Sequence, residues 1–114
     1  MVVTVHGYGR EGMWTTILLG GRNRALATHL AAHLAPALPE YEIVDEIDTI
    51  PLELRGVHDD NPVNVPRLAG VQIELPPRAR GAGSAWNGWT DGLVPHTRSL
   101  IDALATAAVS FDIS

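Results

Sequence analysis

The feature that most constrains the fold is the alternation of short apolar runs with a longer helical pattern. Val2 to His6 and Thr16 to Leu19 are β-branched or apolar runs bounded by glycine, which is typical of strands. After them Leu26, Leu30 and Leu34 recur every four residues, which predicts a helix. Strands that alternate with helices favour an α/β domain with a largely parallel sheet.

The flanking residues indicate where these elements begin and end. Asn23 can accept a free amide of the first helical turn, and Pro36 is expected to end the same helix. Apolar and acidic residues alternate from Tyr41 to Ile47, which predicts an exposed edge strand. Val71 to Leu75 predicts a further strand, and a last helix is expected roughly from Leu93 to Val109.

Two segments lack this periodicity. Residues 49–70 are rich in Pro, Asp, Asn and Arg and predict either a linker or a long functional loop. Residues 78–92 are glycine-rich around two tryptophans and predict a flexible loop that packs locally through its aromatic rings. A length of 114 residues suits a single domain, residues 1–114.

Composition excludes several classes of protein. Cysteine is absent, so disulfide scaffolds and thiolate metal sites are excluded, and a metal would be held by histidine and carboxylate. The formal net charge is −5 and all 8 basic residues are arginine, which disfavours a nucleic-acid partner. No run approaches the ~20 apolar residues of a membrane span. We therefore expect a soluble, cytoplasmic protein with no membrane partner.

Three segments in a fixed order resemble the poly-γ-glutamate hydrolase family, which are zinc enzymes with a carboxypeptidase-like fold. The segments are VTVHGYG, then LLGGRNRAL heading a helix, then NPVNVPRLAGVQIELPPRAR, and the resemblance covers roughly residues 2 to 80. It implies a partial, three-layer zinc-carboxypeptidase-like domain whose mostly parallel sheet is flanked by helices. It also implies hydrolysis of γ-glutamyl amide bonds. Polymeric γ-glutamate, a small γ-glutamyl peptide and a phage or host wall fragment would present similar carboxylates, so the substrate is not distinguished.

One departure from the family pattern concerns the metal ligands. In the family two ligands come from an earlier HGGxIE-like segment, and the strand matched here carries the third. These 114 residues contain no such earlier segment, so the chain resembles the C-terminal half of the hydrolase domain. We expect weak zinc binding, little or no turnover by the chain alone, and self-association through exposed sheet surfaces.

The resemblance makes His6 a zinc ligand and Glu74 the general base. His6 ends its strand, and its alternative role is a histidine before a turn. Alternation in VQIEL places Gln72 and Glu74 on the face opposite Val71, Ile73 and Leu75. The family likeness assigns Glu74 the proton taken from zinc-bound water and delivered to the leaving amine. The alternative is an edge strand with a solvated carboxylate.

Substrate binding is expected from arginine and asparagine side chains. Arg67 is a candidate for gripping the α-carboxylate of a γ-glutamyl unit, because a guanidinium can donate two parallel hydrogen bonds. Asn61 and Asn64 are further candidates in the same loop, and Arg22 and Asn23 lie where a helix start attracts anions. The alternative is an ordered loop with turn-forming asparagines and solvated arginines.

The remaining histidines are interpreted as structural. His29 and His33 are four residues apart and share one helix face, but no glutamate lies between them as in HExxH, so a half-exposed helix face is favoured over a metal site. His58 and His96 are expected to be solvated. A second interpretation of the whole chain is a non-catalytic α/β module that binds an acidic ligand or a partner chain.

Overall fold

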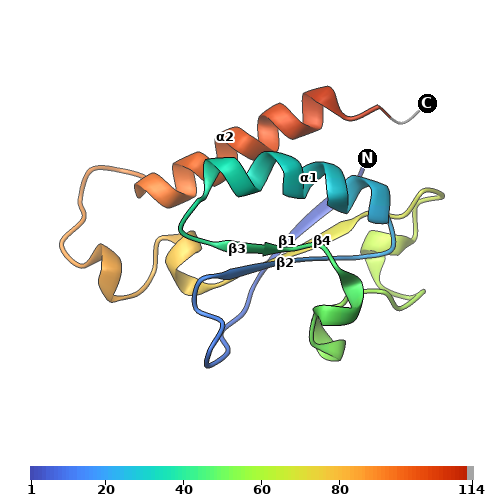
Figure 1. The fold of residues 1–114 in the computed structure, drawn as a ribbon, viewed down its shortest axis with the longest axis horizontal. Coiled ribbons are helices and arrows are strands. Elements are labelled where there is room, and N and C mark those ends of the chain that lie inside the picture. Colours follow the sequence, from blue (N-terminus) through green and yellow to red (C-terminus); the bar gives the residue numbers. More distant parts are fainter. Residues whose placement is uncertain (113–114) are drawn as a thin grey trace.

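A four-stranded sheet lies beneath two helices in the computed structural model, which describes residues 1–112 (Figure 1). The main elements in chain order are β1 (Val3–Gly7), β2 (Thr16–Gly20), α1 (Arg24–Ala37), β3 (Glu42–Val44), β4 (Val71–Leu75) and α2 (Pro95–Ser110). The strand order is β1-β4-β2-β3, with β1 parallel to β4, β2 parallel to β3, and β4 antiparallel to β2. The α/β class is confirmed, and the central pairing is the antiparallel one.

Both helices pack on the same face of the sheet. Ile17 and Leu19 of β2 and Ile73 of β4 are fully buried in one cluster with α1 residues such as Leu30 and α2 residues such as Leu100. This face is apolar because every second strand residue points to it. Burying one such side chain contributes roughly 1.5–3 kcal/mol relative to exposure, so this layer is the main source of stability.

The opposite face of the sheet is covered by short 3-10 segments rather than by a helical layer. Leu18 of β2 packs there with Tyr8 and Ile50. The segments η1 (Ile47–Thr49) and η2 (Leu52–Leu54) lie beneath the sheet in Figure 1. The helices that flank the sheet thus lie on one face, and these short segments cover the other. The helix predicted from Leu93 to Val109 is present as α2. It packs beside α1 on the same face of the sheet.

The boundaries of α1 follow from its first and last turns. Asn23 accepts a hydrogen bond from Leu26 N at 3.0 Å, which confirms the expected N-cap. Pro36 does not end the helix but lies in its last turn, and Leu38 N then donates to Leu34 O at 2.9 Å. Proline has no amide hydrogen, so this last turn lacks one backbone hydrogen bond and the helix ends one residue later, at Ala37.

The segments without periodicity contain short 3-10 turns. Between β3 and β4 lie η1, η2 and η3 (Pro62–Asn64), and β3 itself is shorter than the expected Tyr41 to Ile47 strand. After β4 come η4 (Pro77–Arg80) and η5 (Ser84–Trp86). The rings of Trp86 and Trp89 meet edge to face with centroids 6.3 Å apart, which confirms the expected aromatic packing.

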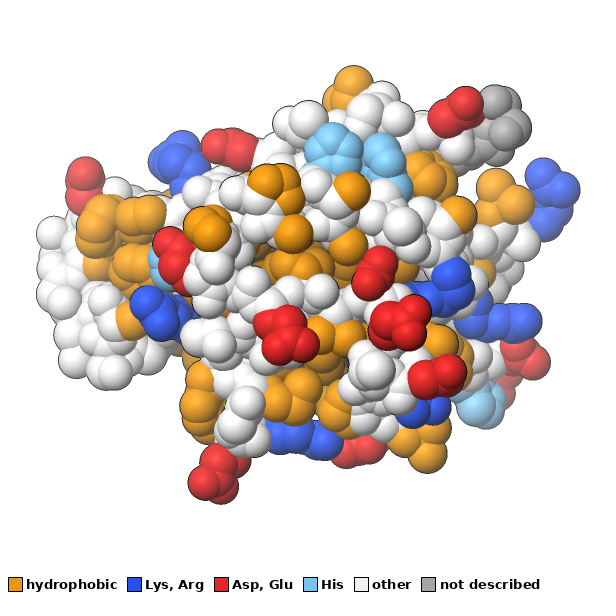
Figure 2. Space-filling model, in the orientation of Figure 1, with side chains coloured by type: hydrophobic (Ala, Val, Ile, Leu, Met, Phe, Trp, Pro, Cys, Tyr) orange, Lys and Arg blue, Asp and Glu red, His pale blue; other side chains and the backbone are white. Residues whose placement is uncertain are grey.

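The surface over β3 is acidic. Figure 2 shows acidic side chains gathered near the middle of this face, and Glu42, Asp45 and Glu46 line one depression there. This distribution places negative charge at the β3 edge of the sheet, away from the β1 edge. Within residues 1–112, neither helix has the length and apolar character that crossing a bilayer requires.

Candidate functional site

His6 and Glu74 lie side by side on neighbouring parallel strands. They are register partners in the β1–β4 ladder, and His6 Nδ1 is 3.6 Å from Glu74 Oε1. Both side chains lie on the face opposite the helices, because their neighbours Val71, Ile73 and Leu75 occupy the helix-facing positions. The sequence predicted that these two side chains would lie within roughly 10 Å of each other, and this proximity is confirmed.

Glu74 is a buried carboxylate with a defined hydrogen-bond partner. The residue is 3% exposed, and its Oε1 accepts a hydrogen bond from Gln72 Nε2 at 2.9 Å. Burial raises the pKa of Glu74, whereas nearby His6 and the Gln72 hydrogen bond act in the opposite direction. The His6 side chain is 51% exposed. The pair therefore joins a desolvated acid-base group to an imidazole that solvent can reach.

A polar chain continues from Glu74 away from His6. Asn61 Nδ2 donates to Gln72 Oε1 at 2.9 Å, so Asn61 orients Gln72, which in turn orients Glu74. Gly56 allows this packing, since a Cβ there would stand 2.9 Å from the Gln72 side-chain amide. Gln72 was placed by the sequence on the face of Glu74 but was not recognised as a site residue. Its position two residues before a buried glutamate is the signal that could have identified it.

Tyr8 holds the segment that follows His6. Its hydroxyl donates to Thr16 O at 2.6 Å and lies 3.2 Å from Met13 O, which fixes the β1–β2 connection. Burial, assisted by the charge of Glu74, raises the pKa of Tyr8 to about 12. Tyr8 therefore stays protonated near neutral pH and acts as a donor that positions the backbone.

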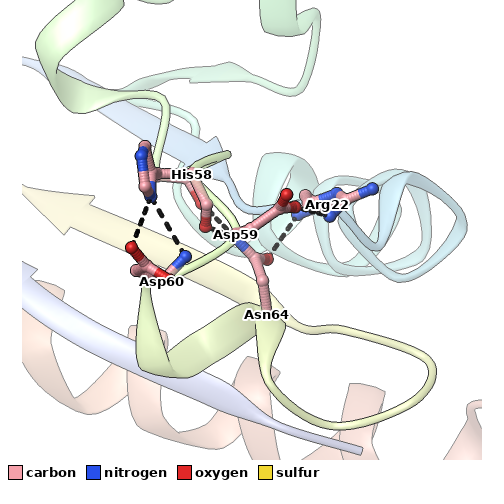
Figure 3. A network of polar contacts seen from close by, with 6 residues as sticks. Arg22, His58, Asp59, Asp60 and Asn64 are labelled. Atoms are coloured by element: carbon pink, nitrogen blue, oxygen red, sulfur yellow. Dashed lines mark hydrogen bonds and ion pairs between the residues drawn. The ribbon is translucent and has the colours of Figure 1, made fainter.

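Asn64 and Arg22 form a network at the other end of the sheet (Figure 3). Asn64 Oδ1 accepts a hydrogen bond from Arg22 N at 3.0 Å, and its amide donates to Gly56 O at 2.7 Å and to His58 O at 2.9 Å. The Arg22 guanidinium pairs with Asp59. These contacts join the β2–α1 turn to the loop before β4, so they stabilise the loop.

The structure brings only part of the predicted site together. Asn61 reaches Glu74 through Gln72, whereas Asn64, Arg22 and Asn23 lie where β2 ends and β4 begins. Arg67 is exposed in the turn closed by Ala69 N and Pro66 O at 2.7 Å, and it has no polar partner within residues 1–112. The substrate-binding roles of these residues remain predictions.

A model of a known protein family matches most of the chain. The model of the family described as Poly-gamma-glutamate hydrolase matches residues 1–83. The chain belongs to the poly-γ-glutamate hydrolase family. The match contains all four strands, α1 and the His6–Glu74 pair, while α2 lies beyond it. Comparisons with curated proteins and with solved structures gave no significant match.

The other histidines of this poly-γ-glutamate hydrolase family member lie away from the pair. His58 is exposed, as expected. His96 was predicted to be solvated, and this prediction is wrong. Its Nδ1 lies 2.8 Å from the Tyr41 hydroxyl, and Trp86 packs against its ring. His29 and His33 face the end of α2, where Ser110 Oγ lies 3.2 Å and 3.3 Å from their Nε2 atoms.

Metal-binding capacity within the described part of the chain is limited. Residues 1–112 contain no group of three or more histidine, aspartate or glutamate side chains placed to hold a metal ion. His6 and Glu74 are a pair, and a catalytic zinc ion requires three protein ligands. The donor set of these residues alone therefore does not fit a catalytic zinc site.

Proposed function

We propose that this chain hydrolyses γ-glutamyl amide bonds, with Glu74 as the group that moves protons and His6 as a metal ligand. The observation that carries the proposal is the His6–Glu74 contact of 3.6 Å within a chain of the poly-γ-glutamate hydrolase family. The substrate is a γ-glutamyl peptide or polymer.

Burial and one hydrogen bond support the proposed role of Glu74 as a general base. A carboxylate whose pKa is raised by burial binds a proton more readily than an exposed one, and efficiency rises as the pKa approaches the working pH. The hydrogen bond from Gln72 holds the carboxylate in one orientation. Glu74 takes a proton from the attacking water and delivers it to the leaving amine.

The small number of metal-binding side chains limits the zinc affinity and turnover expected of the isolated chain. Because His6 and Glu74 do not complete a three-ligand site, we propose that the isolated chain binds zinc weakly and turns over substrate slowly. The same observation favours a second candidate function. In that alternative the chain is a non-catalytic module that binds an acidic ligand or a partner chain.

Zinc titration by calorimetry separates the two functions. The titration is done in a His29→Gln/His33→Gln background, because this i,i+4 pair could bind zinc independently. The enzyme proposal predicts weak zinc binding that disappears in His6→Gln and persists in His58→Gln, an exposed control. A folded protein that takes up no zinc would favour the non-catalytic module. Equal zinc affinity with and without His6 would remove His6 from the metal site.

A further inference from the structure

We propose that a cavity beyond the carboxyl end of β4 binds the side-chain methylenes and the carboxylate of a glutamyl unit of the substrate. The cavity has a volume of about 360 Å³, within the range of roughly 300–1,000 Å³ of small-molecule sites. Its lining comes from three segments: Trp14 and Thr15 before β2, Pro77 and Arg78 after β4, and residues 82–85. The identity of the ligand rests on the proposed function.

The strand register places this cavity at the His6–Glu74 end of the sheet. Leu18 lies opposite Glu74 in the antiparallel β2–β4 pairing, so the residues before β2 adjoin the residues after β4. Glu74 and Pro77 are three residues apart in the sequence, so their Cα atoms lie at most roughly 10 Å apart. The cavity and the His6–Glu74 pair therefore lie at the same end of β4, where open α/β sheets bind ligands.

The arginine side chains differ in whether they already bind a carboxylate or several backbone carbonyls. Those bonded to a carboxylate or to several backbone carbonyls are Arg10, Arg22, Arg24 and Arg55. Those without a carboxylate partner within residues 1–112 are Arg67, Arg78, Arg80 and Arg98. Only Arg78 lines the cavity, and its guanidinium makes no hydrogen bond or ion pair within residues 1–112. A guanidinium at a cavity wall without an acidic partner favours an incoming carboxylate.

The other walls of the cavity suit methylene groups. Trp14 is 51% exposed, and its ring lies close to Gly9, where a Cβ would be 3.3 Å from the indole. Trp14, Pro77 and Ala82 present apolar surface beside Arg78. A ligand that combines a short methylene chain with a carboxylate satisfies both parts of the cavity, as a glutamyl unit does.

Arg80 places a second positive charge at the same end of the sheet. Its Nε donates to Leu75 O at 3.2 Å, and its guanidinium lies over Gly7, where a Cβ would be 2.8 Å from Cζ. The chain as a whole has a formal net charge of −5, so a polyanionic substrate requires a local positive region. Arg78 and Arg80 supply it, and Arg67 lies beyond the opposite end of β4.

Calorimetric titration of the full chain with small ligands tests the cavity without relying on catalysis. The ligands are tri-γ-glutamate, glutarate, and the uncharged glutaramide. We expect the two carboxylates to bind and glutaramide to bind at least tenfold more weakly. Arg78→Gln should weaken carboxylate binding about tenfold or more, because hydrogen bonds to charged groups are the strong ones. Trp14→Ala should weaken tri-γ-glutamate binding, and Arg98→Gln is the matched arginine control.

The outcomes separate the cavity from the proposed reaction. Absence of carboxylate binding by the wild-type chain, or unchanged binding in a folded Arg78→Gln variant, would overturn the cavity assignment. A loss of binding in Arg67→Gln instead of Arg78→Gln would do the same and restore Arg67 as the carboxylate ligand. Arg78-dependent glutarate binding without any γ-glutamyl cleavage would support the cavity and count against the hydrolase proposal alone.

Discussion

Glu74 is an ionisable side chain in a position that opposes its ionisation. It is buried between strands, and one hydrogen bond from Gln72 and one neighbouring imidazole offset the lost hydration only in part. The raised pKa that results links the proposed chemistry of this residue to a measurable property of folding.

The stability of the chain should therefore depend on pH through Glu74. The folded chain holds this proton to a higher pH than the unfolded chain, so stability falls as the pH rises from about the ordinary value of 4.5 through the raised folded-state pKa. Glu74→Gln cannot ionise and should remove this decline. Denaturant unfolding of both proteins at several pH values measures the difference.

The control for this prediction is Glu53→Gln. Arg10 lowers the pKa of exposed Glu53, so this substitution should not remove the decline. Parallel stability curves for the wild-type chain and Glu74→Gln would show that Glu74 is not held in the environment described here.

Inference from the sequence was most accurate for residues whose position depends on the pattern of a single strand. The alternation in VQIEL predicted that Glu74 faces away from Ile73, and the strand-end position of His6 led to its predicted proximity to Glu74. Arg78 and Trp14 were not predicted, because they meet only through the antiparallel pairing of β2 with β4. Local sequence patterns carry no information about that pairing.

The individual elements depend on buried polar side chains as well as on apolar ones. Asn64 is 9% exposed and makes three hydrogen bonds that join the turn before α1 to the loop before β4. A buried amide that satisfies three backbone groups leaves them unpaired when it is removed.

Asn64→Ala should lower the free energy of unfolding by about 1–3 kcal/mol, because the freed amide of Arg22 and the freed carbonyls remain partly buried. Denaturant unfolding monitored by circular dichroism measures this. Asn87→Ala is the matched control, since Asn87 is exposed and its side chain makes no hydrogen bond within residues 1–112. A loss no larger than that of the control would contradict the role of Asn64.

Element boundaries were predictable to the extent that capping and periodicity determine them. The start of α1 at the Asn23 cap and the extent of β4 were predicted closely, whereas Pro36 lies inside α1 and β3 ends at Val44. Helical periodicity does not reveal how far a last turn extends. An alternating pattern cannot show where strand pairing stops.

At the scale of the whole molecule, β1 is the exposed edge of the sheet. Only β4 pairs with β1, so its other side presents backbone donors and acceptors, and Val5 is 54% exposed on this strand. The opposite edge, β3, carries acidic side chains that discourage pairing. The order of the strands could not be predicted from the sequence, because it is set by contacts between distant segments.

We expect concentration-dependent self-association through β1, since unpaired strand edges add further strands. Val5→Lys should shift the protein toward monomer by placing charge at this edge. Val109→Lys, at an exposed position on α2, is the control. Sedimentation velocity at micromolar concentrations measures the change. A compact monomer that unfolds cooperatively under these conditions would contradict the prediction.

The most direct test of the central claim is cleavage of poly-γ-glutamate in the presence of zinc, measured by the appearance of new amino groups. We predict slow cleavage, well below about 1 s⁻¹, that falls to the background rate in Glu74→Gln and is retained in Glu53→Gln. Complete absence of cleavage by the folded wild-type chain would favour the non-catalytic module, and rapid turnover would contradict the incomplete metal site. Equal cleavage by the wild-type chain and Glu74→Gln would contradict the assignment of Glu74 as the catalytic base.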